Sequence, residues 1–294
     1  MKFVLAPDKY KGSLTGLKFC NIVEEEILKA KPNAKIVKLP LADGGDGTIE
    51  VVNYYLEGNP VEVKVKNPFF QPVKAKYLFS KKTKTAFVEM AEASGVKLLK
   101  RTELDCKNAT TFGTGELIID ALNKGAKTII LGIGGSATND CGIGMAEALG
   151  YQFLDKNRML VTPIGANLSK IESITTSQVH PRLKDCQFKI ACDVTNPLYG
   201  KNGAAYVYAK QKGASEEDIE LLDKGLQDFS KVIIEKFNVN PQDIKGAGAA
   251  GGMGIASKIF LGGELISGIE LIKGLAEFDK NIKDANWIIT GEGK

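Results

Sequence analysis

A pattern that recurs along this chain gives the strongest indication of its fold: an apolar run ends in a loop rich in glycine or small polar residues. Five such loops occur, at residues 8–13, 43–48, 132–144, 193–200 and 290–293. In open α/β sheets, loops at the carboxyl ends of parallel strands converge on one crevice that binds ligands. Glycines let the backbone approach an anion, and a following helix N-terminus adds unpaired N–H groups. Plain turn formation is the alternative for any single loop, but five together predict an anion-binding crevice.

The spacing of apolar residues predicts two α/β domains, since 294 residues exceed the usual span of one core. Residues 1–60 with 280–294 are expected to form a Rossmann-like or flavodoxin-like domain with a parallel sheet. Residues 61–279 are expected to form a second, mixed α/β domain, with the active-site cleft between the two. In the second domain, residues 61–66, 73–79 and 85–89 alternate apolar and polar residues, which predicts an antiparallel patch with one solvated face.

Other strands and helices follow from the same periodicities. Strands are expected at residues 3–6, 35–39, 128–131, 151–154, 188–191 and 287–290, and helices at 49–56, 116–123 and 215–236. Ser13 is expected to cap a helix whose apolar positions run from Leu17 to Ile27.

Composition and charge exclude several classes of function. Lys and Arg number 39 against 35 Asp and Glu, and the two signs are interspersed, which argues against a nucleic-acid partner. No apolar run approaches the ~18 residues of a membrane span. The opening apolar run is too short for a signal peptide, so a cytoplasmic protein without a membrane partner is expected. Five scattered cysteines without a C-x-x-C pair indicate neither a disulfide framework nor a zinc site.

The polar residues of the loops suggest specific chemistry. Lys9 and Lys11 flank Tyr10 and can present two ammonium groups to phosphate oxygens, or lie as solvated surface charges. Asp43 and Asp46 stand at a helix start, where carboxylates cap N–H groups or hold hydrated Mg²⁺. Asp193 follows the apolar run at residues 188–192, a position that suits a general base.

Two glycine motifs bear on the class of enzyme. The chain has no G-x-x-x-x-G-K-[ST], which excludes a P-loop kinase. Residues 132–137 match G-x-G-x-x-A, and Asp155 follows near the end of the next predicted strand. An NAD(P)-dependent oxidoreductase is therefore one alternative, and a non-catalytic module that binds an anionic metabolite is another.

Eight segments, taken in order along the whole chain, resemble the signature segments of the bacterial glycerate kinase family. They are residues 6–13, 42–48, 113–118, 132–142, 191–198, 211–214, 246–252 and 290–293. The resemblance implies transfer of the γ-phosphoryl group of ATP to D-glycerate, with 2-phosphoglycerate as the favoured product and Mg²⁺ as a cofactor. Family members usually continue beyond the Gly-Glu-Gly at residues 291–293, so a further C-terminal part is expected to complete the Rossmann-like domain. The oligomeric state stays open.

In this reading Asp193 accepts the proton of the attacking hydroxyl, Lys9 and Lys11 neutralise phosphate oxygens, and Asp43 or Asp46 contacts Mg²⁺. The turn from Gly134 to Asp140 is expected to bind phosphate or the glycerate carboxylate. The residues expected to bind substrate or phosphate are Asp8, Ser13, Asp43, Gly44, Gly45, Asp46, Gly47, Thr48, Gly134, Gly135, Ser136, Asn139, Asp140, Asn196 and Glu292.

Overall fold

The protein forms two compact units, each built around a β-sheet. The structure is a computed structural model that describes residues 1–10, 12–43 and 48–293. One unit contains Met1–Glu57 and Ile266–Lys294, and the other contains Gly58–Leu265. No helix in the described part of the chain is long and apolar enough to cross a membrane. The predicted fold class, mixed α/β with a parallel sheet and an antiparallel patch, is confirmed.

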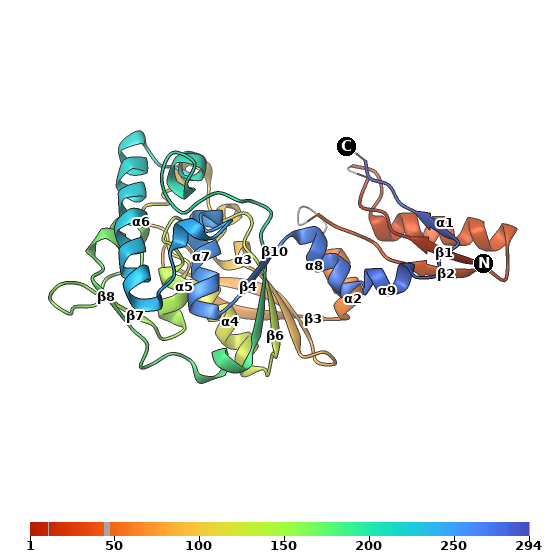
Figure 1. Ribbon diagram of the computed structural model, residues 1–294, viewed down its shortest axis with the longest axis horizontal. Helices are drawn as coiled ribbons and strands as arrows, with labels where there is room; N and C mark the ends of the chain where they lie inside the picture. The colour runs from red at the N-terminus through yellow and green to blue at the C-terminus, as the bar shows by residue number, and fades with distance from the viewer. Residues whose placement is uncertain (11, 44–47, 294) are drawn as a thin grey trace. The chain divides into compact units, whose positions relative to one another are not determined.

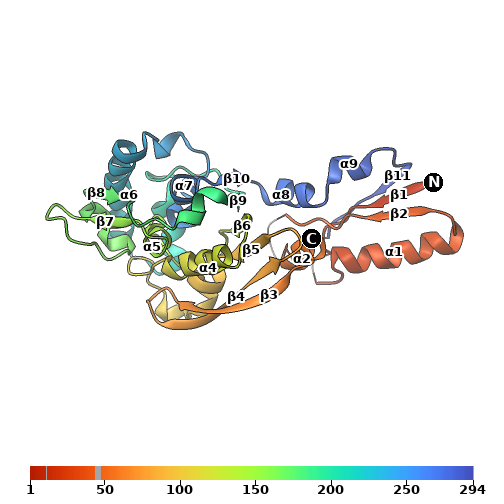
Figure 2. The ribbon, with the colours of Figure 1, turned by 90° about the horizontal axis from the view of Figure 1, so that it is seen from below.

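The first unit has a three-stranded parallel sheet. Its strands are β1 (Lys2–Leu5), β2 (Lys35–Lys38) and β11 (Trp287–Ile289), in the order β11-β1-β2. Because β1 and β2 are parallel, the chain must cross over between them, and α1 (Gly16–Ala30) makes this connection beside the strands in Figure 1. Three further helices belong to this unit, α2 (Thr48–Leu56), α8 (Gly268–Leu275) and α9 (Phe278–Ile282), and Figure 2 shows the last two leading into β11.

The second unit has a six-stranded mixed sheet in the order β10-β9-β6-β5-β4-β3. The strands are β3 (Asn59–Lys66), β4 (Pro72–Ser80), β5 (Thr85–Glu89), β6 (Thr128–Gly132), β9 (Gln187–Ala191) and β10 (Glu264–Ile266). The antiparallel pairs β3–β4 and β4–β5 confirm the predicted patch. However, β5 also pairs in parallel with β6, and its first four residues are buried, as parallel strands in a sheet interior are. The expected solvated face is therefore limited to β3 and β4.

The helices of this unit are α3 (Ala91–Ser94), α4 (Phe112–Asn123), α5 (Ile143–Ala148), α6 (Glu216–Phe237) and α7 (Ala249–Leu261). The long helix α6 lies where the sequence predicts it. Ser215 caps it by accepting from the Asp218 N–H, and Asp218 returns a bond to the Ser215 N–H, which forms a capping box. Its buried stripe includes Leu222, Leu226 and Phe229, at the three- and four-residue spacing of an amphipathic helix.

The strand expected at 151–154 lies outside the main sheet. It is β7 (Gln152–Leu154), which pairs antiparallel with β8 (Ser173–Thr175) in a separate two-stranded sheet. The carboxylate of Asp155 accepts the backbone N–H groups of Asn157 and Met159 and so closes its own turn. Asp155 therefore does not follow a strand adjacent to β6, the arrangement that the dinucleotide-binding interpretation requires.

Candidate active site

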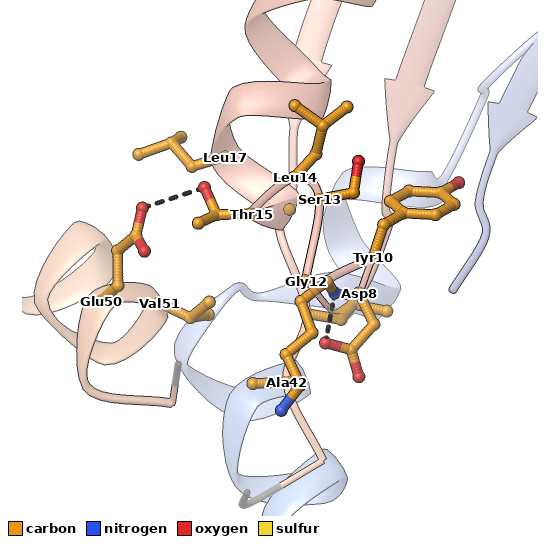
Figure 3. Close-up of a pocket in the computed structure, with 13 residues that line it drawn as sticks. Asp8, Tyr10, Gly12, Ser13, Leu14, Thr15, Leu17, Ala42, Glu50 and Val51 are labelled. Atoms are coloured by element: carbon orange, nitrogen blue, oxygen red, sulfur yellow. Dashed lines mark hydrogen bonds between the residues drawn. The ribbon is translucent and has the colours of Figure 1, made fainter. Parts of the chain in front are cut away.

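A pocket of about 400 Å³ lies at the carboxyl edge of the parallel sheet in the first unit (Figure 3). It is lined by the loop after β1, the first residues of α1, the end of the segment that follows β2, and Glu50 and Val51 of α2. Predicted residues Asp8, Lys9 and Ser13 are among those that line it. The volume falls within the ~300–1,000 Å³ range of small-molecule sites.

The loop after β1 is a tight turn that ends on α1. The backbone N–H of Tyr10 donates to the Leu14 carbonyl at 2.8 Å, and the Ser13 N–H donates to the Tyr10 carbonyl at 2.9 Å. The helix cap is Thr15, not Ser13 as predicted, because the Thr15 hydroxyl accepts the Lys18 N–H. The same hydroxyl donates to Glu50 at 3.1 Å, as Figure 3 shows. Thr15 and Leu17 line the pocket, so the positive end of α1 is available to an anion there.

Carboxylates from the loops after all three strands influence one another. Burial is the largest cause that raises the pKa of the Asp8 carboxyl. The charges of Asp43 and Glu292 raise it further, whereas the backbone N–H and the ammonium group of Lys9 lower it. The structure thus brings Asp8, Lys9, Asp43 and Glu292 into electrostatic contact.

Glu292 is placed by a close approach between two loops. The Asp8 N–H donates to the Gly291 carbonyl at 2.9 Å, and the Gly293 N–H donates to the Lys9 carbonyl at 3.2 Å. A Cβ at position 291 would lie 2.3 Å from the Tyr10 hydroxyl, so a larger residue there would displace the tyrosine ring. The Gly-Glu-Gly sequence therefore holds Glu292 next to the turn that carries Asp8.

Several predicted residues of this unit lie outside the described residues: Lys11, Gly44, Gly45, Asp46 and Gly47. Thr48 is buried at the start of α2. Within the described ranges, no group of three or more His, Cys, Asp or Glu side chains is placed to hold a metal ion.

The second unit has its own row of polar residues at the carboxyl edge of its sheet. Glu89, Gly132 and Ala191 are in register at the ends of β5, β6 and β9, and Asp193 follows Ala191 by two residues. Gly134 and Gly135 are exposed, and Asp193 is exposed as well. The glycine-rich loop and the candidate base therefore follow the neighbouring parallel strands β6 and β9.

Asp140 organises the glycine-rich loop from within. Its carboxylate is fully buried and accepts hydrogen bonds from the Thr111 N–H, the Thr111 hydroxyl and the N–H groups of Gly142 and Gly144. Burial raises the pKa of this carboxyl, and the four hydrogen bonds oppose the rise. These four donors assign Asp140 a part in shaping the loop, and its expected contact with substrate stays a prediction.

Two other predicted residues differ in how far their side chains are engaged. Asn139 is fully buried, yet neither its side-chain nitrogen nor its oxygen has a hydrogen-bond partner among the described residues. Buried polar atoms are rarely left unpaired in folded proteins, so this amide calls for a partner that the described residues do not supply. Asn196, in contrast, donates to the Asn202 carbonyl at 2.9 Å and accepts the Tyr208 hydroxyl at 2.6 Å. Its amide holds the loop after β9.

Glu89 and Lys212 are two polar residues whose place in the structure the sequence patterns do not predict. Glu89 ends a strand that was interpreted only as part of the antiparallel patch, although a carboxylate directly after four apolar or small residues was the available signal. Burial raises the pKa of the Glu89 carboxyl. Lys212 belongs to the segment 211–214, which carried the family resemblance without an assigned function.

The sheet of the first unit ends in a loop that places Lys9 near the N-terminus of α1, and the sheet of the second unit ends in an exposed glycine turn. Loops of these two kinds are typical of α/β proteins that bind phosphate-bearing ligands. The model of the glycerate kinase family matches residues 3–294. The chain therefore belongs to the glycerate kinase family, and it is a kinase, a phosphotransferase that acts on an alcohol group.

Individual relatives agree with this assignment. The chain is 45% identical to the glycerate 2-kinase of Escherichia coli K12 over 294 residues, which are 100% of this chain and 77% of that protein. It is 44% identical to a glycerate kinase of Bacillus cereus, again over 100% of this chain and 77% of the relative. The chain is also similar to a solved structure, "Crystal structure of putative glycerate kinase 2 from Salmonella typhimurium LT2", with a TM-score of 0.94 and 43% identity. This match covers 100% of this chain and 79% of the chain in the solved structure. The oxidoreductase and non-catalytic alternatives do not describe this protein.

Proposed function

We propose that the protein transfers the γ-phosphoryl group of ATP to the 2-hydroxyl of D-glycerate and releases 2-phosphoglycerate and ADP. The observation that carries the proposal is the pocket of the first unit, where Lys9 and the N-terminus of α1 supply positive charge for phosphate groups. The E. coli relative, named glycerate 2-kinase, supports the 2-position. A reaction that consumes ATP also supports the cytoplasmic location expected from the sequence.

In the proposed reaction the hydroxyl oxygen of glycerate forms a bond to the γ-phosphorus, and Asp193 accepts the proton of that hydroxyl. The bond from that phosphorus to the β,γ-bridging oxygen breaks, and ADP leaves with the electron pair. Phosphoryl transfer needs positioning and neutralisation of charge more than covalent catalysis, so Lys9, together with Lys11, would stabilise the equatorial oxygens. The proposal requires loops of both units to contact the bound substrates, which stays a prediction.

We propose that the glycine-rich loop after β6 binds an anionic group of the substrates, phosphate or the glycerate carboxylate. Its exposed glycines offer backbone N–H groups, and the buried Asn139 amide has no partner in the described part of the chain. Ser136 adds a hydroxyl directly beside these glycines.

The carboxylates of the first unit point to a divalent cation as part of the substrate. Asp8, Asp43 and Glu292 would repel a bare nucleotide phosphate, and a bound Mg²⁺ would offset this repulsion. Asp43 is the described candidate to contact the ion, and Mg²⁺ would neutralise the charge that develops on the phosphate oxygens.

The position of phosphorylation can be read directly from the product by ³¹P NMR with proton coupling. A phosphate on the 2-hydroxyl is coupled to one carbon-bound proton and gives a doublet, whereas a phosphate on the 3-hydroxyl is coupled to two and gives a triplet. A triplet as the main product signal would contradict the proposed position without contradicting kinase activity.

A further inference from the structure

The Lys212 ammonium group is buried beneath the glycine-rich loop. The side chain is 4% exposed, and its Nζ donates to the Ser136 hydroxyl at 2.6 Å and to the Thr138 carbonyl at 2.8 Å. Burial lowers the pKa of this lysine to about 8, while the charges of Cys106 and Asp140 act in the opposite direction. A buried ammonium is costly, and an apolar side chain of similar volume often costs the fold nothing. The charge therefore calls for a reason beyond stability.

The backbone of Lys212 is fixed independently of the glycine-rich loop. The Cys106 N–H donates to the Lys212 carbonyl at 3.1 Å. The next residue, Gly213, has a φ of +93°, and a Cβ there would lie 2.0 Å from the Leu104 carbonyl oxygen. Only glycine is tolerated at this contact, so the segment 104–106 holds the lysine in one place.

The backbone around Ser136 is also fixed from another direction. The Val96 N–H donates to the Gly135 carbonyl at 3.0 Å, and the Ala137 N–H donates to the Ser94 carbonyl at 2.9 Å. With the main chain held on both sides of Ser136, the remaining freedom is the rotation of its side chain, and the hydrogen bond from Lys212 to its Oγ restricts this to the direction of the hydroxyl proton.

The ammonium group decides the direction of that hydroxyl. A protonated lysine has only donors, so Ser136 must accept from it, and the serine proton is then directed away from Lys212. A neutral amine has a lone pair and can accept the serine proton instead. The charge state of Lys212 thus determines whether Ser136 offers its proton to a ligand anion.

We propose that Lys212 is a positioning residue that orients the Ser136 hydroxyl as a hydrogen-bond donor to the anionic group bound by the glycine-rich loop. This inference rests on the proposed function, because it concerns the same loop. It adds a residue that acts through another and touches no substrate itself.

The kinetic test compares K212M, S136A and the double variant with the wild type. A hydrogen bond to a charged group contributes about 1.5–3 kcal/mol, so each single variant should lower kcat/KM for glycerate or ATP roughly 10- to 150-fold. Because both act through one hydrogen bond, the double variant should be no more than about threefold worse than the poorer single variant, a sign of coupling. K210M is the matched control, since Lys210 is an exposed neighbour paired with Glu216, and it should stay within about twofold of the wild type.

The pH profile gives a readout that a purely structural role would not change. The wild-type kcat/KM should fall as pH rises through about 8, where Lys212 loses its proton. K212R keeps its charge across this range, so its pH profile should lack that fall. If K212M does not fold, the comparison of K212R with the wild type still tests the inference.

The inference would be overturned if the loss of kcat/KM in the double variant equalled the product of the two single losses. An unchanged kcat/KM in K212M would overturn it as well. If the wild type itself does not phosphorylate glycerate, the proposed function fails. The inference is then decided by binding: inorganic phosphate should raise the Tm of the wild type more than that of K212M. Equal Tm shifts would overturn it.

Discussion

At the residue scale, Asp193 is the side chain on which the proposed chemistry depends most. Asp193→Asn keeps the shape of the side chain and removes the carboxylate that accepts the proton. A positioned base contributes ~10²–10⁴ in rate, so kcat should fall by that range with little change in KM for ATP. Steady-state kinetics measure this, and Asp155→Asn, a carboxylate that only closes its own turn, is the matched control. A variant with more than about a tenth of wild-type kcat would show that Asp193 is not the general base. Glu89, at the same sheet edge, would then be the first candidate.

Lys9→Ala should affect both kinetic constants. Loss of a cation that stabilises the transition state should lower kcat about 10²-fold, and loss of ground-state contact with phosphate should raise KM for ATP. Lys18→Ala, which removes an exposed lysine on α1, should change neither constant. Equal kinetics for the two variants would show that Lys9 is only a surface charge.

The buried charge of Lys212 predicts a pH dependence of stability. Its pKa is about 8 in the folded protein against an ordinary 10.5, so between these values the unfolded chain binds more protons. The free energy of unfolding should therefore rise with pH across this window, by up to about 3 kcal/mol at ~1.4 kcal/mol per unit, and below pH 8 the full cost of burial is present. Urea denaturation of the wild type and K212M measures the difference. Parallel curves for the two proteins would contradict the assignment of a buried charge.

At the element scale, the start of α1 distinguishes the structure from the sequence-based expectation. Thr15 caps the helix, so Thr15→Ala should cost about 1 kcal/mol of unfolding free energy. Ser13→Ala, at the position expected from the sequence, should cost little. Chemical denaturation of both variants checks this, and the reverse ranking would restore Ser13 as the cap.

The elements themselves were predictable where local periodicity determines them. The amphipathic helix α6 and the apolar runs of β1, β6 and β9 were predictable from the spacing of apolar residues alone. The sheet to which each strand belongs was not predictable, because strand pairing depends on residues far apart in the sequence. The strand β7 resembles the other strands in sequence but pairs with β8. The strand β5 pairs with an antiparallel neighbour on one side and a parallel neighbour on the other. The contribution of Glu89 to the sheet edge was missed for this reason.

The candidate site was predictable to a similar degree. Loops that follow parallel strands were identified from glycine and polar residues, and the structure brings Asp8, Lys9, Asp43 and Glu292 into electrostatic contact. Convergence of all five loops on one crevice stays a prediction. The proposed role of Lys212 was not predictable from the sequence, because it depends on a hydrogen bond to Ser136, which lies 76 residues away along the chain. Nothing in the pattern around residues 211–214 indicates that this lysine is buried.

At the scale of the whole molecule, two units carry complementary parts of the proposed reaction. The first supplies the pocket, the carboxylates and Lys9, and the second supplies the glycine-rich loop and Asp193. The domain boundaries expected from the sequence and a single cleft shared by both units stay predictions.

Glycerate is tested as the phosphoryl acceptor by measuring ADP release from the purified protein with ATP, Mg²⁺ and D-glycerate. We expect turnover that requires all three compounds and forms a new phosphate monoester in an amount equal to the ADP. Omission of glycerate is the control for simple ATP hydrolysis. ADP release that is the same with and without glycerate, or no release above background, would contradict the assignment of glycerate as the phosphoryl acceptor.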